Sequence, residues 1–346
     1  MPLGKIKVRR IIMKKVLTLI LVALMLLSII SLAGCGEAQT LKFGMGIQSS
    51  VVKNTNADGE TNGAGEVAHS IAAVLVDKDG KIVKCTIDVA DNTVNYTADG
   101  KAVEASEFLT KREKGKDYGM VAYGGAKKEW YEQADAFAEL VVGKTADEVK
   151  ALIAADTKGT EEVINAGCTI YISDIAYAVA KAVEAAAESE ATADATLDIG
   201  VVTTQSKKDA SEEASGENGV ATSIVAAALD KDGKVIVSST DVADVTFTFN
   251  TKGESTFDAK TEVKTKKALG DNYGMGKYGT DLNGDGKVLE WDAQGAEFDK
   301  ALVGKTAAEI EALAATNGYG SDALQNAGCT MNVADMVKAA VKAAKE

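Results

Sequence analysis

Apolar residues change their spacing along this chain of 346 residues, and each change predicts a different kind of structure. Residues 16–32 form one predominantly apolar stretch. From residue 41, apolar runs of strand length alternate with loops rich in Gly, Asn, Asp and Ser. From residue 129, apolar residues recur at the three- and four-residue spacing of an amphipathic helix. Both patterns then return in the same order in the second half of the chain.

Four apolar runs in each half predict β-strands. The pairs Asp79-Gly80 and Asp232-Gly233 each separate two of these runs, and Asp-Gly between apolar runs is a strong signal for a tight hairpin. Asn54–Gly65 and Ser206–Gly219 are expected to be loops. The predicted strands are Leu41–Val52, Ile71–Val76, Lys81–Val89 and Val94–Tyr96, followed by Leu197–Thr204, Ile224–Leu229, Lys234–Val242 and Val245–Phe249.

Helices are predicted after the strands in each half. Gly143 and Gly304 suit helix C-caps, and Thr145 and Thr306 precede acidic residues in an N-cap arrangement. Because strands come first and helices second, we expect an α+β fold, with an antiparallel sheet packed with helices in each half. The predicted helices are Glu129–Val142, Thr145–Ile153 and Asp174–Ala187, then Glu290–Val303, Thr306–Leu313 and Ala334–Ala344.

Two long segments of the chain repeat one another. Residues 77–81, DKDGK, return 153 positions later, and residues 142–146, VGKTA, return 161 positions later. A period this long predicts tandem modules rather than a solenoid. We therefore expect a first repeat at residues 41–190 and a second at 196–346, with a boundary rich in Ala, Glu, Ser and Thr between them.

The start of the chain predicts export. Lys14 and Lys15 precede the apolar stretch, and Leu32-Ala33-Gly34-Cys35 then places small residues before a cysteine, which is typical of a secretory signal. This ending resembles the lipobox of bacterial lipoproteins, and the resemblance implies a signal peptide at 1–34, a lipid on Cys35 and a tether at 35–40. The protein would then be held on the outer face of the cell membrane. A membrane-spanning anchor is the alternative.

Composition narrows the possible partners and chemistry. Without residues 1–34 the chain has 32 basic and 51 acidic residues, a net charge of −19 that disfavours nucleic acid as a partner. His69 is the only histidine, which argues against histidine-dependent triads and multi-histidine metal sites. We expect no catalytic residues, and we expect the widely spaced Cys85, Cys168 and Cys329 to be small buried residues.

One motif resembles that of a flavoprotein family. Ala166-Gly167-Cys168-Thr169, and its repeat Ala327-Gly328-Cys329-Thr330, each precede an Ala/Val-rich helix. Together with the strand carrying DKDGK, this resembles the FMN-binding domain family, which includes flavin-carrying surface lipoproteins. Its motif is Ser-Gly-Ala-Thr, and a flavin transferase esterifies FMN phosphate onto the threonine. The resemblance implies Thr169 and Thr330 as acceptors, Gly167 and Gly328 in the binding loop, and redox partners outside the membrane.

The same residues also have a purely structural interpretation. Ala stands for Ser and Cys for Ala in both copies, and several residues separate each threonine from the helix that follows. Gly167 and Gly328 would then be turn glycines, and Cys168-Thr169 the start of a short buried strand.

A calcium loop is predicted in the second repeat. Residues 281–292, DLNGDGKVLEWD, place oxygen donors at positions 1, 3, 5 and 12, a glycine at position 6 and a backbone carbonyl at position 7. An acidic turn without metal is the alternative. The expected ligands are Asp281, Asn283, Asp285, Lys287 (through its carbonyl) and Asp292.

The two resemblances together imply a membrane-anchored extracellular lipoprotein that carries electrons on covalent FMN in each repeat. The alternative is a flavin-free lipoprotein that keeps the fold and binds a small ligand or surface partner through loops such as those around Tyr118 and Tyr273. A hydrolase is disfavoured because no nucleophile has a matched base.

Overall fold

The computed structural model describes residues 39–156, 158–279, 281, 284, 286–315 and 317–345. The predicted signal peptide and Cys35 lie outside these ranges, so they stay predictions. Within the described ranges, no helix is long and apolar enough to cross a membrane. Contacts group residues 40–346 into one unit.

The first repeat contains a five-stranded antiparallel sheet in the order β4-β3-β2-β1-β5. Its long strands are β1 (Lys42–Thr55), β2 (Gly63–Val76) and β3 (Ile82–Tyr96). β4 (Ala102–Val103) and β5 (Ala187–Glu188) add two residues at each edge. The long strands form the surface on which the helices of this repeat pack.

The second repeat contains a three-stranded antiparallel sheet in the order β6-β7-β8. Its strands are β6 (Thr196–Lys208), β7 (Gly216–Leu229) and β8 (Val235–Phe249). Met45 pairs with Ala73 in the first sheet, and Ile199 pairs with Ala226 in the second. The two sheets therefore have matching registers, so counterpart positions can be assigned between them.

The α+β prediction is confirmed, but the strands are longer than predicted. Lys81–Val89 and Val94–Tyr96 belong to one continuous strand, and β2 and β7 begin inside the segments expected to be loops. The glycines that suggested a loop have a packing role. A Cβ on Gly63 would lie 2.2 Å from the Tyr96 ring, and one on Gly216 would lie 2.3 Å from the Phe249 ring.

Helices follow the strands in each repeat, and the six predicted helices correspond to α3, α4, α6, α9, α10 and α12. Thr145 and Thr306 form capping boxes with the glutamates three residues later, as the N-cap pattern predicts. The first repeat has α2 (Lys111–Lys114), η1 (Gly115–Tyr118), α3 (Trp130–Leu140), α4 (Ala146–Lys150), α5 (Glu161–Ala166) and α6 (Ser173–Glu184). The second has α7 (Lys266–Leu269), η2 (Gly270–Asn272), α8 (Met275–Tyr278), α9 (Trp291–Leu302), α10 (Ala307–Glu311), α11 (Asp322–Asn326) and α12 (Ala334–Ala343).

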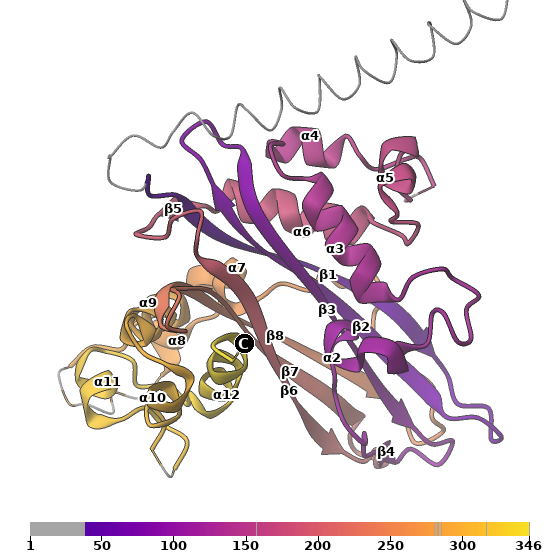
Figure 1. The fold of residues 1–346 in the computed structure, drawn as a ribbon. Helices are drawn as coiled ribbons and strands as arrows, with labels where there is room; N and C mark the ends of the chain where they lie inside the picture. Colours follow the sequence, from indigo (N-terminus) through magenta and orange to yellow (C-terminus); the bar gives the residue numbers. More distant parts are fainter. Residues whose placement is uncertain are drawn as a thin grey trace, which may run out of the picture. The chain divides into compact units, whose positions relative to one another are not determined.

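The two sheets pack against each other, and the main helices cover their outer faces (Figure 1). Ala72 and Val74 of β2 face the helices of the first repeat, whereas Ala73 and Leu75 face Ala226 of the second sheet. This alternation follows from the two-residue period of a strand. The repeats therefore share an interior between their sheets, in addition to the core that each sheet forms with its own helices.

Polar and aromatic contacts also join the sheets. The Tyr96 and Phe249 rings stack with centroids 4.4 Å apart. The buried Asn92 side chain donates a hydrogen bond of 2.8 Å to the buried Thr222 hydroxyl. Because a buried amide without a partner is costly, this bond specifies how the sheets pair.

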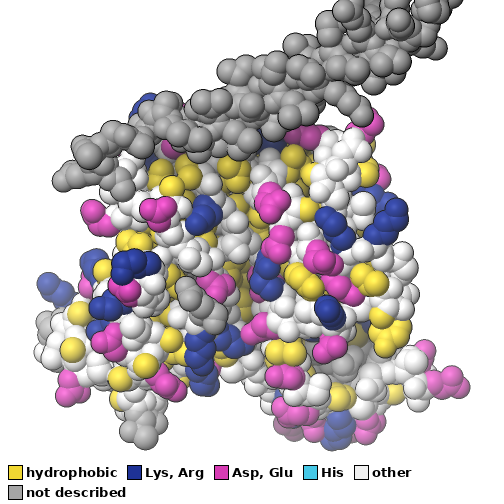
Figure 2. All heavy atoms as spheres, viewed as in Figure 1, with side chains coloured by type: hydrophobic (Ala, Val, Ile, Leu, Met, Phe, Trp, Pro, Cys, Tyr) yellow, Lys and Arg dark blue, Asp and Glu magenta, His cyan; other side chains and the backbone are white. Residues whose placement is uncertain are grey.

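Glycines bring the last helix of each repeat close to its sheet. A Cβ on Gly46 would lie 2.1 Å from the Ala178 carbonyl of α6, and one on Gly200 would lie 1.9 Å from the Ala339 carbonyl of α12. Only glycine permits these approaches. On the outer surface, acidic and basic side chains are interspersed over the face shown in Figure 2.

Candidate functional site

The Gly-Cys-Thr segments lie at the ends of short helices. Gly167 follows α5 with φ of 97°, and Gly328 lies beyond the end of α11 with φ of 102°. This left-handed conformation favours glycine and closes a helix C-terminus. The glycines are therefore turn glycines, as the structural interpretation of the motif expects. Its expectation of a buried strand starting at Cys168-Thr169 is wrong, because neither residue lies in a strand and Thr169 is exposed.

A buried glutamine holds each segment. Thr169 donates to the Gln133 Oε1 atom through its amide (2.8 Å) and its hydroxyl (2.9 Å). Gln294 accepts from the amides of Thr330 (2.8 Å) and Met331 (3.0 Å), with the Thr330 hydroxyl at 3.4 Å. The repeat of these glutamines was visible in the sequence, but their role depends on a contact with a segment 36 residues away.

A glutamate next to each tryptophan holds the Tyr-Gly-Met loop. Glu129 accepts from the amides of Met120 (2.9 Å) and Val121 (3.1 Å), and Glu290 accepts from the amide of Met275 (2.9 Å). These loops contain turns, with Gly119 and Gly274 at positive φ. Much of the repeated sequence therefore maintains one scaffold rather than a reactive centre.

The cysteine of each motif and both tryptophans are buried. Burial raises the pKa of the Cys168 thiol to about 11 and that of Cys329 to about 12. Both thiols are thus protonated at neutral pH and are poor nucleophiles. Trp130 and Trp291 are core residues, with 3% and 2% of their surface exposed.

The two threonines differ in exposure. Thr169 is exposed, whereas Thr330 is 8% exposed. Lys128 and Leu289 occupy counterpart positions before the two helices α3 and α9, and both lie over the glycine of the motif. A Cβ on Gly167 would lie 2.7 Å from Lys128 Nζ, and one on Gly328 would lie 2.9 Å from a Leu289 methyl carbon. The first loop therefore has a cation over its glycine and an exposed threonine, whereas the second has a leucine over its glycine and a buried threonine.

Exposed groups continue beyond Thr169. Tyr171 is 66% exposed, and Lys158 Nζ lies 5.3 Å from the centre of its ring. α6 begins at Ser173, so three residues separate Thr169 from the first turn of that helix. This surface could receive an anionic group together with a planar one.

The predicted calcium loop is described only in part. Asn283 and Asp285 lie outside the described residues, and no group of three potential metal-binding side chains gathers within the described ranges. Asp281 accepts from the amides of Gly284 (2.7 Å) and Gly286 (2.8 Å). Asp292 lies in the first turn of α9, and Lys287 precedes that helix. The calcium site stays a prediction.

No family model, curated protein or solved structure matches the chain. The assignment of a function to the two loops rests on their geometry.

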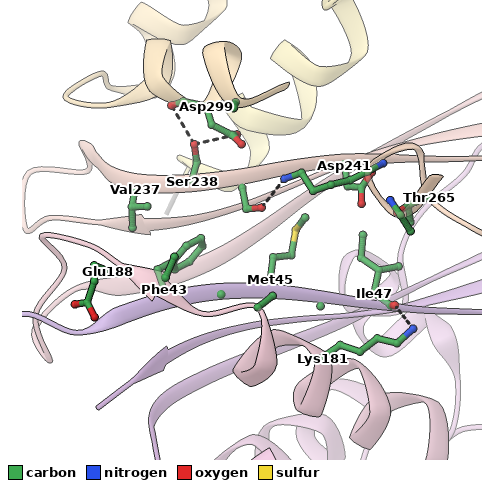
Figure 3. A pocket seen from close by; sticks show the side chains of 18 residues that line it. Phe43, Met45, Ile47, Lys181, Glu188, Val237, Ser238, Asp241, Thr265 and Asp299 are labelled. Carbon is green, nitrogen blue, oxygen red and sulfur yellow. Dashed lines mark hydrogen bonds between the residues drawn. The ribbon is translucent and has the colours of Figure 1, made fainter. Parts of the chain in front are cut away.

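A cavity lies where the sequence suggested no site. It has a volume of about 620 Å³ and opens between strand β1 of the first sheet and strand β8 with α7 of the second (Figure 3). Lys181 and Lys267 contribute its cationic groups. Sequence reasoning missed it because it forms between segments that are far apart in the chain.

His69 lies fully buried between the two sheets. Its Nδ1 atom is 2.8 Å from the Ser49 hydroxyl, and its Nε2 atom has no hydrogen-bond partner among the described residues. Burial lowers the pKa of His69 to about 4, so the ring is neutral at physiological pH. Its repeat counterpart is Thr222, so a function common to both repeats does not depend on it.

Proposed function

We propose that this chain is a lipid-anchored protein of the outer face of the cell membrane that carries FMN on Thr169 and transfers electrons there. The anchor rests on the sequence pattern that ends at Cys35. One observation carries the flavin assignment: Thr169 is exposed, and a lysine ammonium lies over the neighbouring glycine.

The Thr169 loop suits attachment of a phosphate. The flavin transferase would supply FMN from a flavin dinucleotide: Oγ1 of Thr169 loses its proton and bonds to the FMN phosphorus, and the pyrophosphate bond breaks so that AMP leaves. The amide of Thr169 stays bound to Gln133. Lys128 would offset part of the phosphate charge. Because Gln133 fixes the backbone of this loop, the acceptor oxygen is held in place before modification.

The Thr330 loop does not suit the same modification. Its threonine is buried, and Leu289 covers the glycine where Lys128 lies in the first repeat. A phosphate at Thr330 would lose its hydration without gaining a cationic partner, and burial of an unpaired charge costs free energy. The second repeat would keep the fold without flavin.

The bound flavin would supply the redox chemistry, and the chain would supply position and charge. The buried thiols of Cys168 and Cys329 would stay protonated and leave the flavin unmodified. Redox partners would approach the exposed surface around Tyr171.

The experiment is co-expression of the full chain with a flavin transferase, followed by intact mass and in-gel flavin fluorescence. Thr169→Ala is expected to abolish both signals, and the matched variant Thr330→Ala is expected to retain them. An unmodified wild-type chain would overturn the flavin assignment and favour the flavin-free binding lipoprotein.

A further inference from the structure

The cavity in Figure 3 combines an apolar wall with charged groups. Phe43, Met45 and Ile47 lie at alternate positions of β1, so their side chains share the face that borders the cavity. Val237 of β8 extends this wall. The charged residues that line the cavity are Lys181, Glu188, Asp241, Lys267 and Asp299.

Both aspartates of the cavity have partners within the protein. Asp241 accepts from the amides of Val242 (2.8 Å) and Lys267 (3.0 Å). Asp299 accepts from the amide (3.1 Å) and the hydroxyl (2.6 Å) of Thr240. Removal from water raises the pKa of both carboxyls, and the charge of Lys267 opposes that rise. Both aspartates therefore have hydrogen-bond partners within the protein.

Lys267 acts on Asp241 and Asp299 through its charge, although it forms no salt bridge within the described residues. Lys181 forms no salt bridge there either. Its Nζ atom donates one hydrogen bond, of 3.1 Å, to the Ile47 carbonyl. Glu188, the remaining carboxylate, pairs with Lys42 at 3.3 Å. An ammonium group has three donors, so Lys181 can bind a further acceptor.

The counterpart of Lys181 in the second repeat has a carboxylate partner that Lys181 lacks. This counterpart, Lys342, donates to the Val201 carbonyl at 2.9 Å and also forms an ion pair with Glu113. The counterpart of Glu113 is Ala268, which lines the cavity. The cavity therefore contains a methyl group where the other corner of the molecule has a carboxylate.

A second ion pair of the first repeat also lacks its carboxylate in the second repeat. Arg112 donates to Asp135 at 2.8 Å, which fastens α2 to α3. The counterparts of these residues are Lys267 and Ala296, and both line the cavity. The corner around Arg112 therefore contains two ion pairs within the protein. The corner around Lys181 lacks both of these carboxylates, although it has Asp299 where the first repeat has Ala138.

We propose that this cavity binds a small organic acid with an apolar body. The ligand carboxylate pairs with Lys181 and takes the place that Glu113 has beside Lys342. Its apolar part covers Phe43, Met45 and Ile47. This site is separate from Thr169, and it does not depend on flavin attachment.

The test measures hexanoate and hexanol binding to the full chain in non-ionic detergent, by saturation-transfer NMR and calorimetry against a detergent blank. Hexanoate is expected to bind and hexanol to bind more weakly, because the alcohol lacks the charge. Ala268→Glu supplies the carboxylate found in the other repeat and is expected to weaken hexanoate binding about tenfold.

Two further variants keep the test decisive. Lys181→Met keeps the apolar stem and is expected to weaken hexanoate binding by a similar factor. The matched variant Lys342→Met removes the counterpart lysine and is expected to leave the affinity unchanged. Equal binding of hexanoate and hexanol, unchanged affinity in Lys181→Met, or no hexanoate binding at millimolar concentration would overturn the proposal.

Discussion

The loops around Thr169 and Thr330 share one scaffold but present different surfaces. Each has a glycine at positive φ, a buried cysteine and a glutamine that binds the threonine amide. They differ at Lys128 and Leu289, which lie about forty residues earlier in the chain. A repeated motif can therefore preserve a local structure while a residue about forty positions away changes the charge that lies over it.

The corners around Lys181 and Lys342 differ in the same manner. Both lysines donate to a strand carbonyl, but only Lys342 has a carboxylate partner. Divergence between the repeats thus replaces Glu113 and Asp135 by alanines and Ala138 by Asp299, and leaves the framework of strands and helices in place.

The largest predicted effect concerns the shared scaffold. Gln294→Ala leaves two buried amides without a partner and is expected to lower the free energy of unfolding by about 3–4 kcal/mol. Gln133→Ala is expected to cost about 2 kcal/mol, because water can reach the exposed Thr169. Urea unfolding measures both, with Gln48→Ala as a control that removes one hydrogen bond of 3.4 Å. A larger loss for Gln133→Ala than for Gln294→Ala would contradict this ranking.

His69 is expected to make the free energy of unfolding depend on pH, and its counterpart Thr222 has no titrating group. The pKa of His69 is about 4 in the native state and about 6.5 in the unfolded chain, so the unfolded chain binds the proton first as the pH falls. Between pH 6.5 and 4 the wild type should lose about 3 kcal/mol of stability relative to His69→Thr. Other titrating groups, such as Asp88, cancel in this difference. Denaturant unfolding across the pH range measures it, and a difference independent of pH would exclude His69 as its source.

Lys128 tests the contrast between the two threonine loops. Lys128→Leu copies the second repeat and is expected to reduce flavin attachment at Thr169 about tenfold, since one charge-assisted contact to phosphate is lost. Lys127→Leu changes a neighbouring exposed lysine and is the control. The fraction of chains that gain the mass of FMN reports the effect. An equal fraction of FMN-carrying chains in the two variants would show that Lys128 does not promote flavin attachment.

The smallest predicted effect concerns calcium, whose loop occurs only in the second repeat. At a calcium concentration equal to its dissociation constant, about 1 mM for a weak extracellular site, binding contributes about 0.4 kcal/mol. The melting temperature is then expected to rise by about 0.6 °C, and Asp281→Ala should remove the response. Asp79→Ala, in an acidic hairpin turn, should retain it. A chain that responds equally to magnesium and calcium would count against the loop.

Local patterns in the sequence predicted most of the fold. Strands, hairpin turns and helix caps follow from neighbouring residues, as the capping boxes of Thr145 and Thr306 show. The polar segment that includes Asn92 was expected to interrupt β3, but Asn92 is satisfied by Thr222 of the other sheet. A long-range partner of this kind cannot be read from one strand.

Predicting the candidate sites required knowledge of long-range contacts even more than predicting the fold did. The sequence identified Thr169 and Thr330 as equals, and only their surroundings distinguish them. The cavity beside Lys181 arises where segments from both repeats meet. The exchanges from Glu113 to Ala268 and from Asp135 to Ala296 were visible in the repeat, but their meaning required the positions of Lys181 and Lys267.

The central claim is that one repeat carries flavin and the other does not. The most direct measurement is the number of FMN groups per chain in the full-length wild type co-expressed with a flavin transferase, from intact mass and peptide mapping. We predict one FMN, on the peptide that contains Thr169. Two FMN groups, or one on the peptide that contains Thr330, would contradict the claim.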